Sequence, residues 1–190
     1  LKFIPVKSTK QTQFGIHGNG RMDVDKAYDR IMNKFRWGGF DKYDMYITSS
    51  FMPSYYAHKT LFERTAYELL AKFDNDRAVD IVDKYFEAFP HMNFPYNVQT
   101  LNLLRVYERA LAYDKLKFHL EILADETEDL LAFYQSLSTE DLNAGFASDQ
   151  RAALQIVTEM KRMATTANDT EFLNELKQRF DVYEVQGVKG

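Results

Sequence analysis

The sequence contains no cysteine in its 190 residues. This absence excludes a disulfide framework, a thiolate metal site and a cysteine nucleophile. It leaves the cellular compartment open, because a chain of this length builds a core without crosslinks. Long apolar runs are also missing: no stretch approaches the roughly 20 residues of a membrane-spanning helix, and no basic N-terminus precedes an apolar segment as in a signal peptide. We therefore expect no membrane span within this chain.

Clustered positive charge is missing as well. Lys and Arg number 24 against 28 Asp and Glu, for a net charge of -4. Binding to phosphate backbones requires clustered basic residues, so we expect no nucleic-acid partner. What is present, 45% hydrophobic and 15% aromatic residues, is typical of a globular domain. Because the chain opens at Leu1 without an initiating Met, we expect it to be a piece of a longer protein.

Apolar residues recur every three or four positions from Asp23 onward, which predicts one helix after another. Helices joined by short turns lie antiparallel, since no other arrangement buries both apolar faces. The sequence therefore predicts an all-α fold, an array of antiparallel helical hairpins with a degenerate, tetratricopeptide-like repeat. The expected helices span about 24–36, 54–73, 76–89, 97–111, a segment capped by Asp114, a short one from Thr127 to Leu137, 149–164, and a last one opened by a capping box of Asn168 and Glu171.

Three regions follow from this pattern. Residues 1–53 are expected to be a loop-rich N-terminal segment with one helix, packed on the body, and Gly38 and Gly39 would end that helix. The α-hairpin domain is expected at 54–183, with a loop at 138–148, and residues 184–190 form a tail. The tetratricopeptide likeness is clearest in the first hairpin, where a close helix crossing needs small residues and the unit ends in proline: Ala66, Ala78 and Pro90.

The residue types that carry catalysis are present without the spacing that catalysis needs. His17, His58, His91 and His119 lie too far apart to share a helical face, so we expect no metal site. The glycines of residues 15–20 match no phosphate-binding motif and suggest a flexible loop. Carboxylate pairs lie at helix starts and turns, where they cap helices. We therefore predict no catalytic, cofactor-binding or metal-binding residue and no cofactor. The enzyme alternative, a carbohydrate-active enzyme, would need two carboxyls roughly 5 to 10 Å apart across a pocket.

The least ordinary stretch is residues 34–46, where aromatic side chains alternate with charges next to a Gly-Gly pair. Such side chains stack on sugars, peptides or bases. Alternatively, they staple a loop-rich segment onto the helices. The candidate binding surface on this hypothesis is formed by Arg21, Arg36, Trp37, Phe40, Tyr43 and Tyr46, with Trp37 as the first side chain to test.

Several short motifs prompt a comparison with a known family. They are Phe3-Ile4-Pro5-Val6, Gly20-Arg21-Met22-Asp23, Tyr28-Asp29, the run from Met32 to Gly38, Phe89-Pro90 and Pro95-Tyr96. Together they resemble the C-terminal region of a bacterial family of multi-pass membrane proteins that long carried only a domain-of-unknown-function label. That family is related to protein O-mannosyltransferases and is similar to glycosyltransferases of the GT-C type. The most specific part of the resemblance lies at residues 20–38.

The resemblance implies a location rather than an active site. In GT-C enzymes the catalytic acid and the lipid-linked sugar site belong to the membrane body, so no catalytic residue is transferred to this chain. The expected function is that of a non-catalytic, extracytoplasmic domain of a membrane glycosyltransferase-like protein. On the periplasmic, outer face of the cytoplasmic membrane it would pack against its own membrane body and bind an acceptor protein or partner subunit. The alternative is a free-standing tetratricopeptide-like adaptor for protein-protein interaction.

Overall fold

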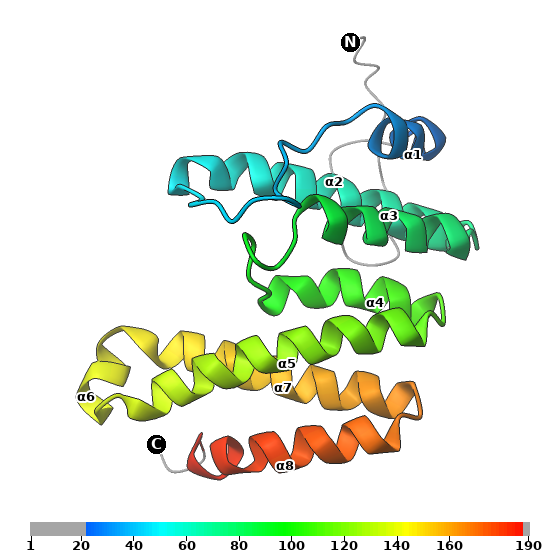
Figure 1. Cartoon of the computed structure of the whole chain (residues 1–190). Coiled ribbons are helices and arrows are strands. Elements are labelled where there is room, and N and C mark those ends of the chain that lie inside the picture. The colour runs from blue at the N-terminus through cyan, green and yellow to red at the C-terminus, as the bar shows by residue number, and fades with distance from the viewer. Residues whose placement is uncertain (1–21, 188–190) are drawn as a thin grey trace, which may run out of the picture. The chain divides into compact units, whose positions relative to one another are not determined.

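The computed structural model describes residues 22–187, and every regular element in that range is a helix (Figure 1). The predicted all-α fold of helical hairpins is therefore confirmed. The chain divides into two compact units, residues 1–94 and residues 95–190, which we call unit 1 and unit 2. No helix among residues 22–187 combines the length and the apolar character needed to cross a bilayer.

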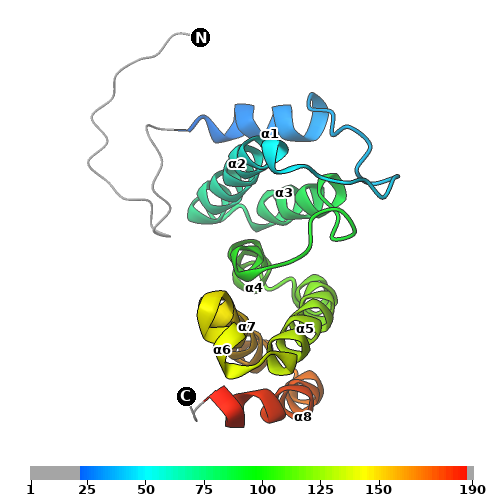
Figure 2. The same cartoon turned by 90° about the vertical axis from the view of Figure 1, so that its left-hand side faces the viewer.

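Unit 1 is a helical hairpin with a third helix laid on it. Helices α2 (Met52–Ala71) and α3 (Asn75–Ala88) pack along each other, and α1 (Val24–Asn33) lies against both (Figure 2). The short 3-10 helix η1 (Ser49–Phe51) leads into α2. The small residues predicted at the crossing, Ala66 and Ala78, are both fully buried. Their size lets the two backbones approach closely.

Polar contacts fix α1 on this hairpin. Asp23 caps the helix by accepting the N–H of Lys26 at 3.1 Å. The Tyr28 hydroxyl donates to Asp80 Oδ2 at 2.7 Å, and the Arg77 guanidinium lies 5.2 Å from the centre of the Tyr28 ring. Helix α1 is thereby joined to α3 by a side-chain hydrogen bond in addition to its apolar contacts.

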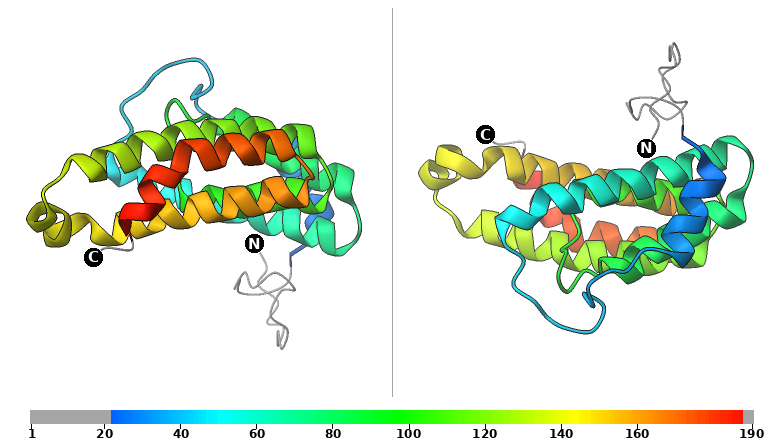
Figure 3. Two further views of the ribbon diagram at one scale, coloured as in Figure 1. Left: turned by 90° about the horizontal axis from the view of Figure 1, so that it is seen from below. Right: turned by 90° about the horizontal axis from the view of Figure 1, so that it is seen from above.

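Unit 2 contains two further hairpins. Helices α4 and α5 form one and α7 and α8 the other; α5 also packs along α7, and α8 lies beside both (Figure 3). Ion pairs connect them: Arg162 holds Glu108 at 2.7 Å, and Arg179 holds Glu128 at 2.6 Å. The elements are η2 (Val98–Thr100), α4 (Leu101–Arg109), α5 (Tyr113–Ser136), α6 (Thr139–Asp141), the π-helical η3 (Leu142–Phe146), α7 (Ala147–Thr166) and α8 (Thr170–Gly187).

The three hairpins turn in the same way. Each first helix ends in a left-handed residue, Phe73, Leu111 or Asn168, with φ of 60°, 60° and 57°. The following residue in each case donates its N–H to the carbonyl five positions back, at 2.9 to 3.0 Å. This pattern is the Schellman motif, in which glycine is the usual left-handed residue. The repeat is therefore more regular in backbone geometry than in sequence.

The two helices predicted around Thr127 are one continuous helix, α5. The prediction of a helix start at Thr127 is wrong because its hydroxyl donates to the Leu123 carbonyl at 2.6 Å, four residues back, instead of capping a new N-terminus. The buried positions continue across the predicted break, through Leu120, Leu123, Thr127 and Leu131.

The loop predicted at 138–148 is also helical, being occupied by α6, η3 and the start of α7. Ser138 is the N-cap of α6, because its hydroxyl accepts the N–H of Asp141 at 3.1 Å. The glycine and polar residues that follow favoured a loop in the sequence, so this cap was not recognised. The helix cap predicted at Asn168 lies one residue later, at Asp169. Asn168 adopts the left-handed conformation, and Asp169 accepts the N–H of Phe172 at 2.9 Å.

Helix ends differ from expectation in two further places. Helix α1 ends at Asn33, before the predicted end near residue 36, and Gly38 and Gly39 form a separate turn with φ of 60° and 81°. Helix α8 extends to Gly187, so part of the expected tail is helical. Along the chain the two compact units divide between residues 94 and 95. Residues 22–53 thus belong with the first hairpin as one unit.

Candidate functional site

A set of packed aromatic rings lies at the end of unit 1 where α2 begins and α3 ends. We call it the aromatic cluster. Ring centres are 5.1 Å apart for Phe40 and Phe94, 4.7 Å for Tyr55 and Phe94, and 5.2 Å for Phe89 and Phe94. The Tyr55 hydroxyl pairs with that of Tyr85 at 2.7 Å, and burial raises the pKa of Tyr55. The members are Trp37, Phe40, Phe51, Tyr55, Phe62, Tyr85, Phe89 and Phe94.

Trp37 belongs to this cluster. Its ring centre lies 5.6 Å from His58, 5.2 Å from Phe62 and 5.4 Å from Phe89. Its indole Nε1 is buried and has no hydrogen-bond partner among the described residues. This packing supports the stapling role that the sequence left open for Trp37. The residue predicted as the first one to test for binding is therefore also a structural residue.

Asn93 fixes the segment above the cluster. Its side-chain Nδ2 donates to the carbonyls of Phe40 and Tyr43 at 2.8 and 2.7 Å, and its Oδ1 accepts the N–H of Met45 at 2.7 Å. Asn93 is buried, so these bonds are shielded from water. We call residues 40–46 the tyrosine loop. Its backbone is held by one side chain from the turn after α3.

The tyrosine loop points two large side chains outward. Tyr43 is 64% exposed and Tyr46 is 91% exposed. Gly39 packs its backbone against the Tyr43 ring, at 3.7 Å from where a Cβ would lie, and its φ of 81° disfavours any other residue there. Two tyrosines are therefore presented to solvent on a fixed backbone.

The remaining predicted surface residues divide into three groups. Arg36 is exposed, and its Nη1 donates to the Phe35 carbonyl at 3.0 Å. Phe40 is half-buried between Phe51, Phe89 and Phe94 and supports the loop from below. Arg21 lies outside the described residues. The structure thus places Tyr43 and Tyr46 on one exposed loop and packs the rings of Trp37 and Phe40 into the aromatic cluster.

Sequence reasoning did not identify Asn93. It lies in a turn of four residues after Pro90, where asparagine is unremarkable because it is a common turn residue. Only its distance from Phe40 and Tyr43 in the fold reveals its role, and no local pattern encodes a contact across 50 positions.

One buried ion pair lies elsewhere in unit 1. Lys59 and Glu63 are one turn apart on α2, are both buried, and contact each other directly. Burial lowers the pKa of Lys59, and the Glu63 carboxylate opposes that shift. Lowered lysine pKa values occur at nucleophilic lysines, but here the partnered carboxylate stabilises the charged ammonium. We interpret this pair as structural.

Two of the histidines, and the carboxylates that begin α1 and α3, have local partners. His58 packs on Trp37, and the Tyr96 hydroxyl pairs with His119 Nδ1 at 2.7 Å; His17 lies outside the described residues. Within residues 22–187, no group of three His, Asp or Glu side chains could hold a metal ion. Asp23 and Asp74 cap α1 and α3, as expected for carboxylates at helix starts.

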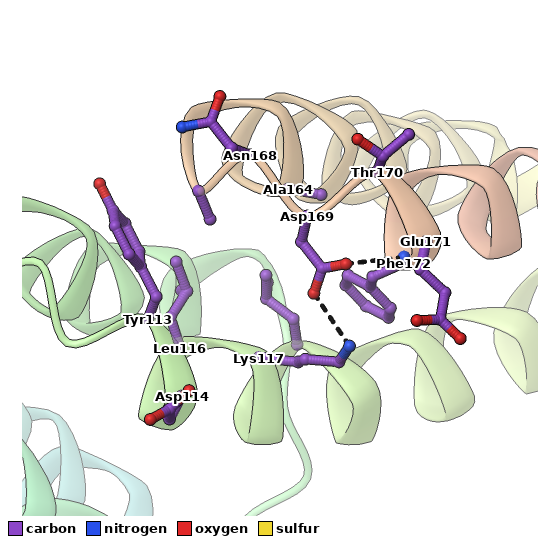
Figure 4. Close-up of a pocket in the computed structure, with 12 residues that line it drawn as sticks. Tyr113, Asp114, Leu116, Lys117, Ala164, Asn168, Asp169, Thr170, Glu171 and Phe172 are labelled. Atoms are coloured by element: carbon purple, nitrogen blue, oxygen red, sulfur yellow. Dashed lines mark hydrogen bonds and ion pairs between the residues drawn. The ribbon is translucent and has the colours of Figure 1, made fainter.

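Unit 2 contains a pocket of about 430 Å³ between the start of α5 and the turn from α7 to α8 (Figure 4). The Lys117 ammonium ion-pairs with Asp169 at 2.9 Å and lies 5.6 Å from the Phe172 ring centre. The hydrogen bond from the Phe172 N–H lowers the pKa of the Asp169 carboxyl, and the hydrogen bond from Lys117 lowers it further. Lys117 and Asp169 neutralise each other, and the carboxylates of Asp114 and Glu171 also line the pocket. The floor is apolar, formed by Leu116, Leu120, Ala164 and Phe172.

No protein-family model matches this sequence, and searches of curated proteins and of solved structures also gave no match.

Proposed function

We propose that this chain is a non-catalytic protein-binding domain whose contact surface is the tyrosine loop. The observation that carries the proposal is the Asn93 side chain, which makes three hydrogen bonds to the loop backbone and leaves Tyr43 and Tyr46 exposed. A loop with only a structural purpose would turn its aromatic rings inward, as Phe40 does. Here the inward rings and the hydrogen bonds hold a loop from which Tyr43 and Tyr46 project into solvent, 64% and 91% exposed.

Fixed, exposed tyrosines are well suited to binding. A tyrosine supplies a large apolar ring and one hydroxyl with few rotatable bonds, so it loses little conformational entropy on binding. Tyrosine is also enriched among the residues that contribute most to protein interfaces. Because Asn93 orders the backbone in advance, binding does not have to order it. The exposed charges around the rings, Asp41, Lys42 and Asp44, form a polar rim.

The setting of this domain is proposed from the family resemblance. It places the chain on the periplasmic, outer face of the cytoplasmic membrane, as part of a membrane glycosyltransferase-like protein that binds an acceptor protein or a partner subunit. A free-standing tetratricopeptide-like adaptor is the alternative, and the three matching hairpin turns are compatible with it. The two are distinguished by whether the gene encodes a series of membrane spans upstream of Leu1.

The experiment is affinity capture with the full chain and three variants. Tyr43→Ala combined with Tyr46→Ala should abolish capture of a partner that the parent chain retains. Asn93→Ala should weaken capture although both tyrosines are present. The matched control is Phe73→Ala, which also removes an exposed aromatic ring of unit 1. It lies beyond the far end of the 20-residue helix α2, roughly 30 Å from its start.

Equal capture by the parent chain and the double tyrosine variant, with both folded by circular dichroism, would refute the proposed contact surface. If the Phe73→Ala control lost the partner while the tyrosine variants kept it, the binding surface would lie at the opposite end of the α2–α3 hairpin.

A further inference from the structure

Unit 2 carries a one-sided distribution of charge. Residues 118–150 contain eight Asp and Glu and no Lys or Arg, although the whole chain is close to charge balance. In the fold, the later part of this segment connects α5 to α7 at one end of these two helices. Helix α6 and η3 lie at that end, drawn in yellow in Figure 1. We call residues 129–149 the acidic tip.

Apolar side chains are exposed on the same tip. Leu130 is 40% exposed, Phe133 46% and Phe146 39%. The rings of Phe133 and Phe146 meet edge to face, with centres 5.7 Å apart, and Tyr134 lies beneath them, 6.2 Å from Phe146. Leu130 and Phe133 are three residues apart on α5 and so lie on one face. The patch therefore joins α5 to η3 across the end of the hairpin.

The carboxylates of the tip are available for a partner. Arg179 of α8 neutralises Asp125 and Glu128, which precede the tip, at 2.7 and 2.6 Å. Within the described part of the chain, Asp129, Glu140 and Asp149 form no ion pair, and all three are exposed. Asp149 follows Phe146 by three residues, and burial, with a smaller effect from the Asp149 charge, raises the pKa of Tyr134.

We propose that the acidic tip is a second docking surface and that its occupant is a basic amphipathic segment of a partner protein. The exposed rings would take the apolar face of that segment, while its Lys and Arg would pair with Asp129, Glu140 and Asp149. Charge complementarity decides between occupants. An anionic lipid surface and the acidic tip of a second copy are both repelled by these carboxylates. The proposal lies in unit 2 and does not depend on the tyrosine loop.

The test uses a labelled helical peptide with Lys on one face and Leu on the other, titrated with the full chain by fluorescence anisotropy. Phe133→Ser with Phe146→Ser should weaken binding by about tenfold or more. So should the combined variant Asp129→Asn, Glu140→Gln and Asp149→Asn, whose exposed positions leave the fold unchanged. Added salt should weaken binding by the parent chain more than by this neutralised variant.

One control variant and one control peptide accompany this test. Phe118→Ser removes a more exposed phenylalanine, 59% exposed, from the same helix outside the tip, and should leave affinity unchanged. A peptide with Glu in place of Lys should not bind. The proposal is overturned if the Glu peptide binds equally, if the Phe133/Phe146 variant keeps full affinity, or if vesicles of anionic lipid bind where the Lys peptide does not. Concentration-dependent dimerisation abolished by the Phe133/Phe146 variant would also overturn it, in favour of self-association.

Discussion

Replacing Phe73 with glycine is expected to stabilise unit 1, although it deletes a large aromatic side chain. Phe73 has φ of 60° at the turn between α2 and α3, and its side chain is 92% exposed. A left-handed conformation costs an L-residue about 1–2 kcal/mol. Glycine avoids that cost but loses about 0.5–1 kcal/mol through the greater freedom of its unfolded chain. The net expectation is a gain of about 0.5–1 kcal/mol.

The matched comparison is Phe73→Ala. Alanine removes the same exposed ring but keeps the strained backbone, so its stability should stay within about 0.5 kcal/mol of the parent chain. The difference between the glycine and alanine variants therefore isolates the backbone contribution. Leu111→Gly at the equivalent turn of unit 2, where φ is also 60°, should show a gain of the same sign.

The assay is guanidinium unfolding followed by tryptophan fluorescence. The chain has a single tryptophan, Trp37, which lies in unit 1, so the signal reports on the unit that contains Phe73. The midpoint should rise for Phe73→Gly with an unchanged slope. A glycine variant no more stable than the alanine variant would show that residue 73 is not held in the strained conformation.

Three further sets of substitutions test individual contacts. Asp169→Ala should cost about 1 kcal/mol in chemical unfolding because it removes the cap of α8. Asn168→Gly, which removes the side chain but fits the left-handed backbone, should cost less, and the reverse order would support Asn168 as the cap. Burial and the hydrogen bond to Asp80 raise the pKa of Tyr28 to about 12 from its ordinary value of 10.0, so its contribution is complete below pH 10 and is lost as pH rises through 12. Stability measured over this interval should fall less steeply in Tyr28→Phe, and an identical pH profile would contradict the contact. Trp37→Ala should cost about 3 kcal/mol by leaving a cavity, while Trp37→Phe should cost much less because it keeps the ring packing and removes an unpartnered donor; equal costs would exclude the stapling role.

The parts of the fold that the sequence predicted are those encoded by local periodicity. The apolar spacing predicts buried residues of α2 and α3 such as Phe62, Leu69, Ile81 and Val82, and the small residues predicted at the crossing, Ala66 and Ala78, are fully buried. The errors arose where two local signals compete. The Thr127 hydroxyl can cap a helix N-terminus or donate to a carbonyl one turn earlier inside a helix. Because the residues on both sides continue one buried face, the helix continues through Thr127.

The candidate site was predictable only in part. Composition marked the aromatic segment, but it could not separate rings that pack inward, such as Trp37 and Phe40, from Tyr43 and Tyr46, which point outward. That division depends on which rings meet α2 and α3 after folding. The hydrogen bonds of Asn93 depend on the same tertiary arrangement, so no pattern near residue 93 could reveal them.

The proposed binding role requires the tyrosine loop to be ordered before any partner binds, and amide hydrogen exchange at Met45 measures this order directly. Its N–H is donated to the buried Asn93 Oδ1 at 2.7 Å, so exchange in the free chain should be slow, and Asn93→Ala should accelerate it strongly. Fast exchange at Met45 in the parent chain, at the rate of the Asn93→Ala variant, would contradict a preformed binding loop.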